Sequence, residues 1–420
     1  NIVDTSKYID YTIVNPRNLS IDRQMDLCQR CHLQGVAVLN EGKTFYDFKP
    51  GMKLSDVMNI YLPRFTDSDK RFIMASQADR LKQSNCFKVS GQLSCINCHN
   101  PHHDVHSISQ NRYNESCNSC HHQASNLSQL LACSAPAASL KAKGNDCVSC
   151  HMPPSGSIDI PHVNITDHYI SRHNIYQPNK DTITSEKKEE IAGFLGLKSL
   201  VLPQTSDLQM ARAYLALWDK FMASEAILDS AKFYLDRSLA PRTDKLNTLV
   251  HYYFNKQEYA LLVSVAPLAN TIKKPWTAYR IGEAASKMKQ LAKATDFYKR
   301  AADLLPYNLN FQEKLGTNYA QIQLFKKAEK VFEFILKEDP KRKKSLSNLG
   351  LIKAQKGRLN EALKFYDKAL ASDPDYNIAL LNKIGVLIQL NRKQQAQTVI
   401  NHLIDKHPEY RTMLQKRGLL

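Results

Sequence analysis

Eight cysteines and four histidines of this chain fall into four copies of one short pattern. The pattern is Cys-X-X-Cys-His, and it occupies residues 28–32, 95–99, 117–121 and 147–151. With 10 Cys and 14 His among 420 residues, random placement would yield about 0.01 copies. Because this spacing is the attachment signature of c-type haem, the sequence predicts four covalently bound haems.

Each residue of the pattern has its own task in haem attachment. Two thiols three positions apart can form thioethers with the two vinyl groups at one porphyrin edge, and the adjacent imidazole can bind the iron as the proximal ligand. The predicted thioether residues are Cys28, Cys31, Cys95, Cys98, Cys117, Cys120, Cys147 and Cys150. The predicted proximal iron ligands are His32, His99, His121 and His151.

Paired cysteines also serve two other chemistries, which are kept as alternatives. The gap between Cys95/Cys98 and Cys117/Cys120 suits a zinc ribbon. Zinc needs only the four thiolates, however, so a ribbon gives no reason for a histidine after every pair. A dithiol redox site predicts a single pair that follows a strand, which does not account for four pairs.

Iron that only carries electrons needs a sixth ligand, and the first 180 residues contain seven spare histidines. The candidate distal ligands are His102, His103, His106, His122, His162, His168 and His173. His102 and His103 follow His99 too closely to reach the opposite face of the same iron, so they would serve a neighbouring haem. Met25 and Met152 are thioether alternatives, and Met152 is expected to pack instead.

Two cysteines, Cys86 and Cys133, lie outside the four patterns. Attachment of c-type haem takes place in an oxidising compartment, so we expect these two thiols to form a disulfide. The alternative is a pair of buried free thiols.

The elements that position these residues are expected to be helices and coil with little sheet. A capping-box-like start at residues 66–69 predicts a helix over 66–83, and Ser20 can cap a second helix leading into Cys28. One haem for every 45 residues or so leaves little room for an aliphatic core. The porphyrins themselves are therefore expected to form the core of this part.

A second region repeats with a fixed period. Pro306, Pro340, Pro374 and Pro408 are spaced by 34 residues, the period of the tetratricopeptide repeat. Aligned on these prolines, a small residue recurs at 294, 328, 362 and 396, and a Leu-Gly or Ile-Gly pair ends at 282, 316 and 350. Gly385 is one place out of register, which predicts a degenerate last repeat. With weaker helix pairs over 210–239 and 245–270 and a closing helix over 410–420, about six helical hairpins are expected.

The cysteines and the charge divide the chain in the same way. All cysteines lie before residue 151; residues 1–180 carry a net charge of +3, and residues 181–420 carry +14. The expected organisation is a haem domain at 1–180, a linker at 181–205 and a repeat domain at 206–420. The basic run Lys341–Arg–Lys–Lys344 is more typical of a solvated helix start than of a nucleic-acid site, and no segment is apolar enough to span a membrane.

Together these features resemble the multihaem cytochromes c of the doubled-CxxCH type that carry C-terminal tetratricopeptide repeats. The segments that carry the resemblance are LCQRCH, SCINCHNPHH, CNSCHH, CVSCHMP, DIPHVNITDHYISRH and the 34-residue repeats. It implies an all-α fold, with a haem-cored helix-plus-coil domain followed by an α-solenoid, and electron transfer in the periplasm or at the cell surface. It also implies His102, His162, His168 and His173 as distal ligands. Similar proteins carry further CxxCH patterns before a VNPRNLS-like segment, so this chain is expected to be shortened or to lack N-terminal residues.

The leading hypothesis is an electron carrier and not an enzyme: four haems relay electrons, and the repeats bind redox partner proteins or further copies of this chain, a filament included. The alternative is a haem oxidoreductase acting on a small nitrogen or sulfur compound at an open iron. A CxxCK pattern, as in pentahaem nitrite reductases, is absent from the sequence. A third hypothesis gives the haems a structural role in a repeat scaffold.

Overall fold

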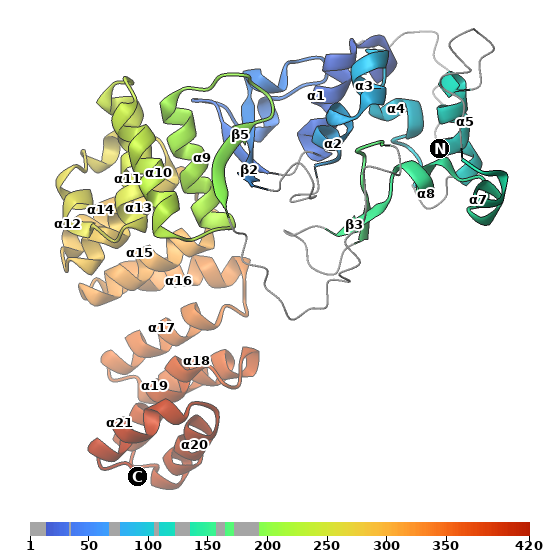
Figure 1. Ribbon diagram of the computed structural model, residues 1–420. Helices are drawn as coiled ribbons and strands as arrows, with labels where there is room; N and C mark the ends of the chain where they lie inside the picture. Colours follow the sequence, from blue (N-terminus) through green and yellow to red (C-terminus); the bar gives the residue numbers. More distant parts are fainter. Residues whose placement is uncertain are drawn as a thin grey trace, which may run out of the picture. The chain divides into compact units, whose positions relative to one another are not determined.

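The computed structural model describes residues 14–32, 35–66, 76–104, 109–121, 135–156, 164–171 and 193–420. The chain divides into two compact units, Asn1–Leu239 and Ala240–Leu420, which we call the N-terminal and C-terminal units (Figure 1). The expected boundary lies earlier, with residues 206–239 assigned to the repeat domain. Within the described residues, no helix has both the length and the apolar character of a membrane span.

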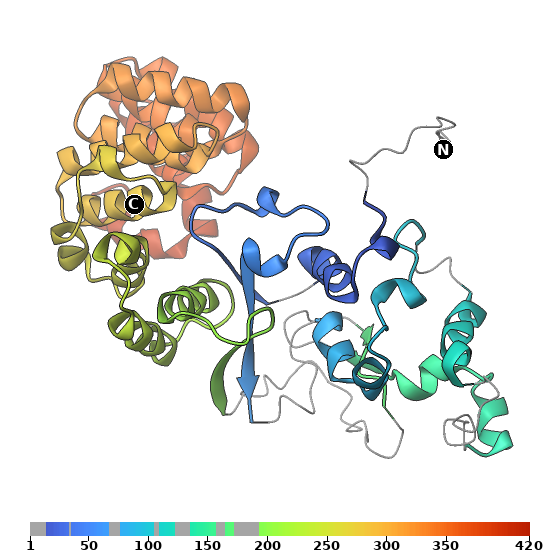
Figure 2. The ribbon, with the colours of Figure 1, turned by 90° about the horizontal axis from the view of Figure 1, so that it is seen from above.

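A three-stranded antiparallel sheet organises part of the N-terminal unit. Its order is β1 (Val36–Leu39), β2 (Met58–Phe65) and β5 (Phe194–Ser199), with Val36 opposite Tyr61 and Leu62 opposite Lys198. Figure 2 shows β5 beside β2. Buried Leu54, Val57, Met58 and Ile60 form an apolar cluster at this sheet.

The sheet corrects two expectations for this part of the chain. Strand β5 lies inside 181–205, which was expected to be a linker, and the strands depart from an all-α fold. The physical reason is long-range pairing: β2 is buried along most of its length and receives hydrogen bonds from strands distant in sequence. Such pairing leaves no hairpin signal between β2 and β5.

The helices that carry or border the cysteine patterns are short. In chain order, they are α1 (Ile21–His32), α2 (Gln77–Gln83), α3 (Asn85–Ser90), α4 (Cys95–Cys98), α5 (Gln110–His121), α7 (Ala137–Ala142) and α8 (Cys147–His151). Single 3-10 turns occur at η1 (Pro16–Asn18), η2 (Phe45–Asp47) and η3 (Leu54–Asp56), and β3 (Pro154–Gly156) pairs with β4 (Asn164–Thr166).

Of the two helices predicted in this unit, one is present and the other begins later than expected. The helix after Ser20 is confirmed: α1 begins at Ile21, and the amide of Gln24 donates to the Ser20 carbonyl at 2.9 Å. The prediction of one helix over 66–83 is wrong, because Ser76 has a non-helical backbone and α2 begins only at Gln77. Residues 67–75 lie outside the described ranges.

A small apolar cluster joins the first helices. Met25, Ala78 and Leu81 are buried, with partly buried Cys95 and Ile170 against them. The sulfur of Met25 lies 4.0 Å from that of Cys95. This methionine, considered as a thioether alternative for iron, therefore packs between α1, α2 and α4.

A helical hairpin completes the N-terminal unit. It consists of α9 (Asp207–Lys220) and α10 (Glu225–Arg237). The side chain of Gln209 donates to Asn40 at 3.0 Å, and Arg212 pairs with Glu41 at 2.9 Å. Tyr214 meets Phe194 of β5 edge-on. These contacts explain why this hairpin, expected to belong to the repeat domain, groups with the sheet.

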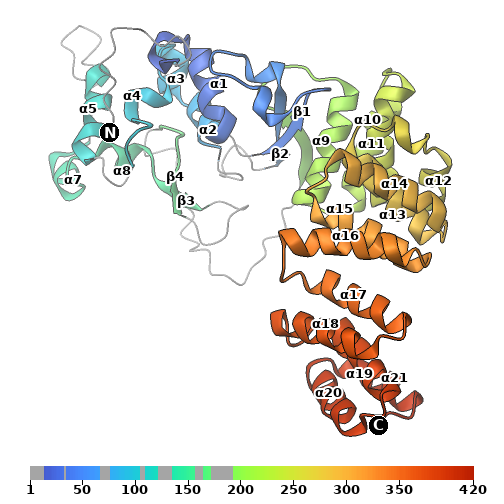
Figure 3. The same ribbon diagram turned by 180° about the vertical axis from the view of Figure 1, so that it is seen from behind.

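The C-terminal unit is built from helical hairpins stacked one after another (Figure 3). The helices are α11 (Arg242–Asn255), α12 (Tyr259–Ser264), α13 (Pro275–Lys287), α14 (Leu291–Leu304), α15 (Leu309–Gln321), α16 (Phe325–Glu338), α17 (Lys343–Gln355), α18 (Leu359–Ser372), α19 (Asn377–Gln389), α20 (Lys393–Lys406) and α21 (Arg411–Lys416), with η6 (Ala269–Thr271) and η7 (Pro408–Tyr410). The first helices of four consecutive hairpins begin at 275, 309, 343 and 377, which confirms the period of 34 residues. With α9–α10, the number of hairpins is six, as predicted.

In three consecutive hairpins, a glycine in the first helix faces an aromatic ring in the second. A methyl group added at Gly282, Gly316 or Gly350 would lie 2.8, 2.9 or 2.6 Å from the nearest ring atom, in Tyr298, Phe332 and Tyr366 respectively. The absence of a side chain therefore lets the two helices close around the ring.

The last hairpin solves the same packing problem differently. Ile384 occupies the glycine position and Ile400 the aromatic position, and both lie in one buried cluster. In this hairpin two isoleucines thus fill the space that a glycine and an aromatic ring fill in the preceding hairpins. Gly385, one place out of register, has no heavy atom within 4 Å of an added methyl group, which confirms that this repeat is degenerate.

Candidate functional site

Every Cys-X-X-Cys-His pattern coincides with a short helical segment. Two patterns form the last turns of α1 and α5, the third spans α4 with His99 as its C-cap, and the fourth is α8. In a helix, side chains three positions apart lie on the same face. Each cysteine pair therefore presents both thiols on one side, with the histidine directly after the second thiol.

Side-chain hydrogen bonds connect each pattern to another. The Ser94 hydroxyl before α4 donates to Gln24 of α1 at 2.7 Å, and the Ser116 hydroxyl of α5 donates to the Asn97 carbonyl at 2.9 Å. Asn114 of α5 accepts from the amide of Cys147 at 3.0 Å. Residues next to the cysteines therefore hold the four patterns together as one group.

The thiols of neighbouring patterns influence one another. A hydrogen bond with Cys95 lowers the pKa of Cys28 to about 7, against the opposing effect of burial, while the same bond and burial raise the pKa of Cys95. Burial, followed by the nearby Cys147, raises the pKa of Cys117 to about 12. Since the thiolate is the reactive form, Cys28 is the most readily ionised of these three thiols.

The nine described cysteines form no disulfide with one another. Cys86, half-buried in α3, is one of them, and burial raises the pKa of its thiol. Its predicted disulfide partner, Cys133, lies outside the described residues, so the disulfide remains a prediction.

A proximal and a distal candidate face each other. The ring centres of His99 and His168 are 6.0 Å apart, with 27° between the ring planes. A metal–imidazole bond is about 2 Å, and a ring centre lies roughly 1 Å beyond its nitrogen, so two imidazoles on one iron have centres roughly 6 Å apart. The observed separation has this value; the rings are stacked, so binding one iron would require them to turn their nitrogens towards it.

Burial lowers the pKa of both of these imidazoles. The charge of His32 lowers the pKa of His99 further, whereas the Thr166 carbonyl acts in the opposite direction on His168. Neutral imidazole is the form that binds a metal. The surroundings of His99 and His168 therefore favour the ligating form.

Two candidate ligands have one ring nitrogen already occupied. Nδ1 of His151 lies 2.8 Å from the Ser171 carbonyl, and Nδ1 of His168 lies 3.0 Å from the Thr166 carbonyl. A carbonyl oxygen only accepts, so each Nδ1 carries the hydrogen and Nε2 keeps its lone pair. Metal-binding histidines commonly show this second interaction, which fixes the tautomer and the ring orientation.

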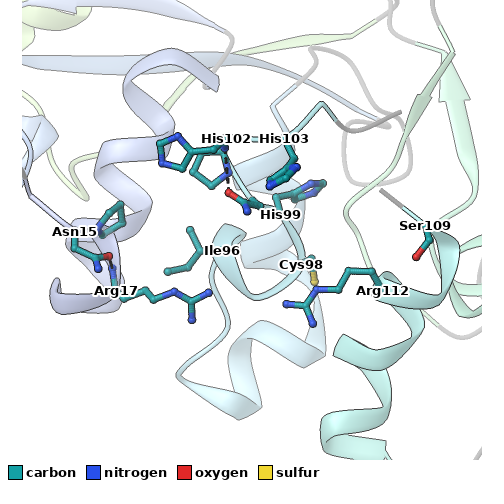
Figure 4. Close-up of a pocket in the computed structure, with 12 residues that line it drawn as sticks. Asn15, Arg17, Ile96, Cys98, His99, His102, His103, Ser109 and Arg112 are labelled. Carbon is teal, nitrogen blue, oxygen red and sulfur yellow. Dashed lines mark hydrogen bonds between the residues drawn. The ribbon is translucent and has the colours of Figure 1, made fainter. Parts of the chain in front are cut away.

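A cavity of about 480 Å³ lies beside the second pattern (Figure 4). Its lining combines apolar Ile96 and two prolines with Cys98, His99 and two guanidinium groups, those of Arg17 and Arg112. Apolar side chains and cations in one cavity suit a flat apolar ring that carries carboxylates. The donor set and this lining fit a covalently attached porphyrin.

The other candidate histidines lie in different surroundings. His102 and His103 are exposed and line the cavity beside their own pattern, in a turn where both backbone amides bond to Asn100. His32 is exposed, and His121 is half-buried at the end of α5. The candidates His106, His122, His162 and His173 lie outside the described residues.

The zinc alternative requires the four thiols of Cys95, Cys98, Cys117 and Cys120 to converge. All four are described, and no group of three or more Cys, His, Asp or Glu in the described ranges is arranged to hold a metal ion.

Sequence reasoning missed the residues that surround these ligands. Arg17 and Arg112 line the cavity, and Arg80 forms a buried ion pair with Asp167, next to His168. The pair is separated by 87 positions, so local pattern could not connect its members. The one sequence signal for this pair was Asp167, an aspartate directly before the candidate ligand His168.

The basic run 341–344 is a helix start, as predicted. Helix α17 begins at Lys343, and Arg342 pairs with Glu313 at 3.3 Å, while Lys343 pairs with Asp373 and lies over the Tyr376 ring. Half of the run is therefore engaged in contacts between neighbouring hairpins.

Comparison with known proteins concerns the repeats. The family model of the tetratricopeptide repeat matches residues 353–416. The mouse and human proteins called Protein O-mannosyl-transferase TMTC3 are 23% and 22% identical over 175 residues, which is 38% of this chain and 19% of theirs. The match thus spans about a fifth of the length of those relatives.

Similar solved structures include MamA AMB-1, at 18% identity over 39% of this chain and 98% of that chain, with a TM-score of 0.34. The Arabidopsis OM64 TPR domain is 23% identical over 27% of this chain and 95% of that chain, with a TM-score of 0.27. The family match and the spacing of the hairpins identify tetratricopeptide repeats in the C-terminal region.

Proposed function

We propose that this protein is an electron carrier with four covalently bound c-type haems, working in the periplasm or at the cell surface. The observation that carries the proposal is the occurrence of four Cys-X-X-Cys-His patterns, each on a helical segment and all connected by hydrogen bonds. When bound, haem iron supplies one-electron chemistry.

The chain's own residues have three tasks in this proposal. The eight paired thiols hold the porphyrins covalently, and the four following histidines bind the irons from one side. On the other side of the second iron, His168 is the ligand that its distance from His99 supports. Arg17 and Arg112 face the cavity where carboxylates at the porphyrin edge would be neutralised.

The repeats supply the docking surface. Residues 240–420 contain 32 Lys and Arg against 16 Asp and Glu, a net charge of +16, while residues 1–239 contain 25 against 24, a net charge of +1. A body this basic attracts acidic surfaces at distances up to a Debye length of about 10 Å. We propose an acidic redox protein, or another copy of this chain with its haem carboxylates, as the partner.

The first test measures the haems in the purified protein. A pyridine haemochrome assay should give four haems per chain, and intact mass should exceed that of the polypeptide by four covalent haem groups. A ferric electron-spin resonance spectrum should show low-spin signals only. A colourless protein of bare polypeptide mass would overturn the proposal, and a substantial high-spin signal in the unaltered protein would favour catalysis at an open iron instead.

A second test addresses docking. Binding of the acidic partner, or self-association, should weaken strongly when salt is raised from low concentration to half-molar, because screening shortens the range of the attraction. Association that is indifferent to salt would contradict the role assigned to the charge of the repeats.

A further inference from the structure

A buried ion pair connects α2 to the segment that carries His168. Nε of Arg80 donates to Oδ1 of Asp167 at 2.9 Å, and Nη2 donates to Oδ2 at 2.6 Å. The two residues are only 5% and 2% exposed. The geometry is the two-pronged pairing of guanidinium and carboxylate, which fixes direction as well as distance.

Burial of such a pair calls for a reason other than stability. Desolvation of two charges is costly, and an apolar pair of similar size is often at least as stabilising. A rigid buried pair does, however, fix one arrangement of the chain. The residues next to this pair belong to the turn that carries His168.

The turn on either side of His168 is fastened at several points. The amide of Asp167 donates to the Pro153 carbonyl at 3.1 Å, and its carboxylate accepts from the amide of Tyr169 at 2.9 Å. The guanidinium of Arg80 lies over the Tyr169 ring, 4.9 Å from its centre. The residues that precede and follow His168 are therefore both held by the Arg80–Asp167 pair.

Helix α2, the other end of this connection, is seated on the first two patterns. Its Ala78 and Leu81 pack with Met25 of α1, and Cys95 of α4 borders the same cluster. Arg80 thus transmits the position of the helices carrying Cys28 and Cys95 to the turn that carries His168.

We propose that the Arg80–Asp167 pair is the positioning device that holds His168 opposite His99, so that both imidazoles bind one haem iron. The proposal rests on the proposed haem function. Arg80 and Asp167 are positioning residues, since they act through His168. Without the pair, the turn loses its anchor on α2, and the iron beside His99 loses its distal ligand.

The experiment compares variants of the full-length, haem-loaded protein. Arg80→Met and Asp167→Asn should each retain four haems, but one haem should change from low-spin to high-spin in the ferric spectrum, a loss of about a quarter of the low-spin signal. Added imidazole should restore the low-spin signal, because a free ligand can occupy the vacated position. His168→Ala sets the full size of the effect.

Two further variants separate positioning from folding. Removal of one partner leaves a buried charge, which destabilises the protein by itself. The double variant Arg80→Met/Asp167→Asn removes both charges, so its melting temperature should recover towards that of the unaltered protein while its high-spin signal persists. Arg212→Gln, which breaks the exposed pair with Glu41, should leave every haem low-spin.

The outcomes distinguish the two proposals. If the unaltered protein binds no haem, the proposed function fails. If it binds four haems and His168→Ala produces high-spin iron, but the pair variants remain entirely low-spin, the function stands and the positioning role is overturned. If His168→Ala itself remains low-spin, the pairing of His168 with His99 is wrong, and the positioning role fails with it.

Discussion

Each of the two regions of this chain is stabilised internally by a different kind of interaction. In the C-terminal unit, one cluster alone contains 21 buried apolar residues. Around the cysteine patterns, the cluster at Met25 contains three buried residues, and side-chain hydrogen bonds and the Arg80–Asp167 pair connect the short helices.

The comparison shows where the polypeptide supplies its own core. A solenoid buries apolar surface between neighbouring repeats, as residues 240–420 do. A cluster of three residues buries little apolar surface, and the helices around it are short. If porphyrins are attached as proposed, they would add an apolar body to the cysteine region.

The largest expected effect follows from withholding haem. If the chain is produced without haem attachment, mild protease should cut the region of the four patterns at least about tenfold faster than in the haem-loaded protein, because its open states become populated. Residues 240–420 should survive as a fragment of unchanged resistance. Mass spectrometry of the timed digests gives the result, and equal resistance of the cysteine region in both preparations would contradict it.

Substitution of a repeat glycine tests the packing of the C-terminal unit. Gly350→Ala places a methyl group 2.6 Å from the Tyr366 ring. Overpacking costs about 1–3 kcal/mol, of which better helix propensity returns about 1 kcal/mol, so a net loss of about 0–2 kcal/mol is expected.

The matched control is Gly385→Ala in the last repeat. An added methyl group there meets no atom within 4 Å, so stability should rise by about 0.5–1 kcal/mol. Urea unfolding of both variants measures the difference. Equal effects would show that the glycine register has no structural role.

A smaller effect is expected from two tyrosines at equivalent positions. The Tyr298 hydroxyl donates to Glu283 at 2.5 Å, so Tyr298→Phe should cost about 1 kcal/mol. The buried Tyr366 hydroxyl has no hydrogen-bond partner in the described chain, so Tyr366→Phe should be neutral or slightly stabilising. Chemical unfolding of both variants compares them, and a larger loss for Tyr366→Phe would contradict this account.

The smallest effect concerns acid stability. Burial acts to raise the pKa of Glu329, but the ammonium groups of Lys353 and Lys356, at 2.8 and 2.6 Å, outweigh it and lower the pKa. Because the folded pKa is lowered, this stabilisation is present above the unfolded value of about 4.3 and is lost as pH falls through the folded value.

Glu329→Gln should therefore cost about 0.5–1 kcal/mol at neutral pH and nothing at a pH below both values. Unfolding free energies measured from about pH 7 to pH 3 give the profile. Exposed Glu333, on the same helix, is the control: Glu333→Gln should leave the profile within about 0.5 kcal/mol of the original. A constant difference at every pH would contradict the assignment.

The sequence predicted the two regions with unequal success, for a physical reason. The repeats recur locally, so the prolines and glycines located the hairpins, including the degenerate one at Gly385. The strands β2 and β5 and the Arg80–Asp167 pair join residues far apart in sequence, where no spacing rule operates. The prediction of a helix over 66–83 failed because its capping signal starts at residue 66, whereas α2 begins only at Gln77.

The cysteine patterns fixed the identity of the candidate ligands but not their arrangement. Histidines were numerous, and spacing alone could not select His168 over the other candidates. Its position opposite His99 depends on the pairing of β3 with β4 and on the contacts of Asp167. That information lies in tertiary contacts.

The short stretch 164–171 contacts two patterns at once, through His168 beside His99 and through Ser171, whose carbonyl holds His151. His168 and Ser171 are only three positions apart, so the chain between them cannot absorb a shift at one end. A substitution that shifts the environment of one of these imidazoles should therefore shift that of the other as well. Engineering of this protein should treat these two environments as a single adjustable part.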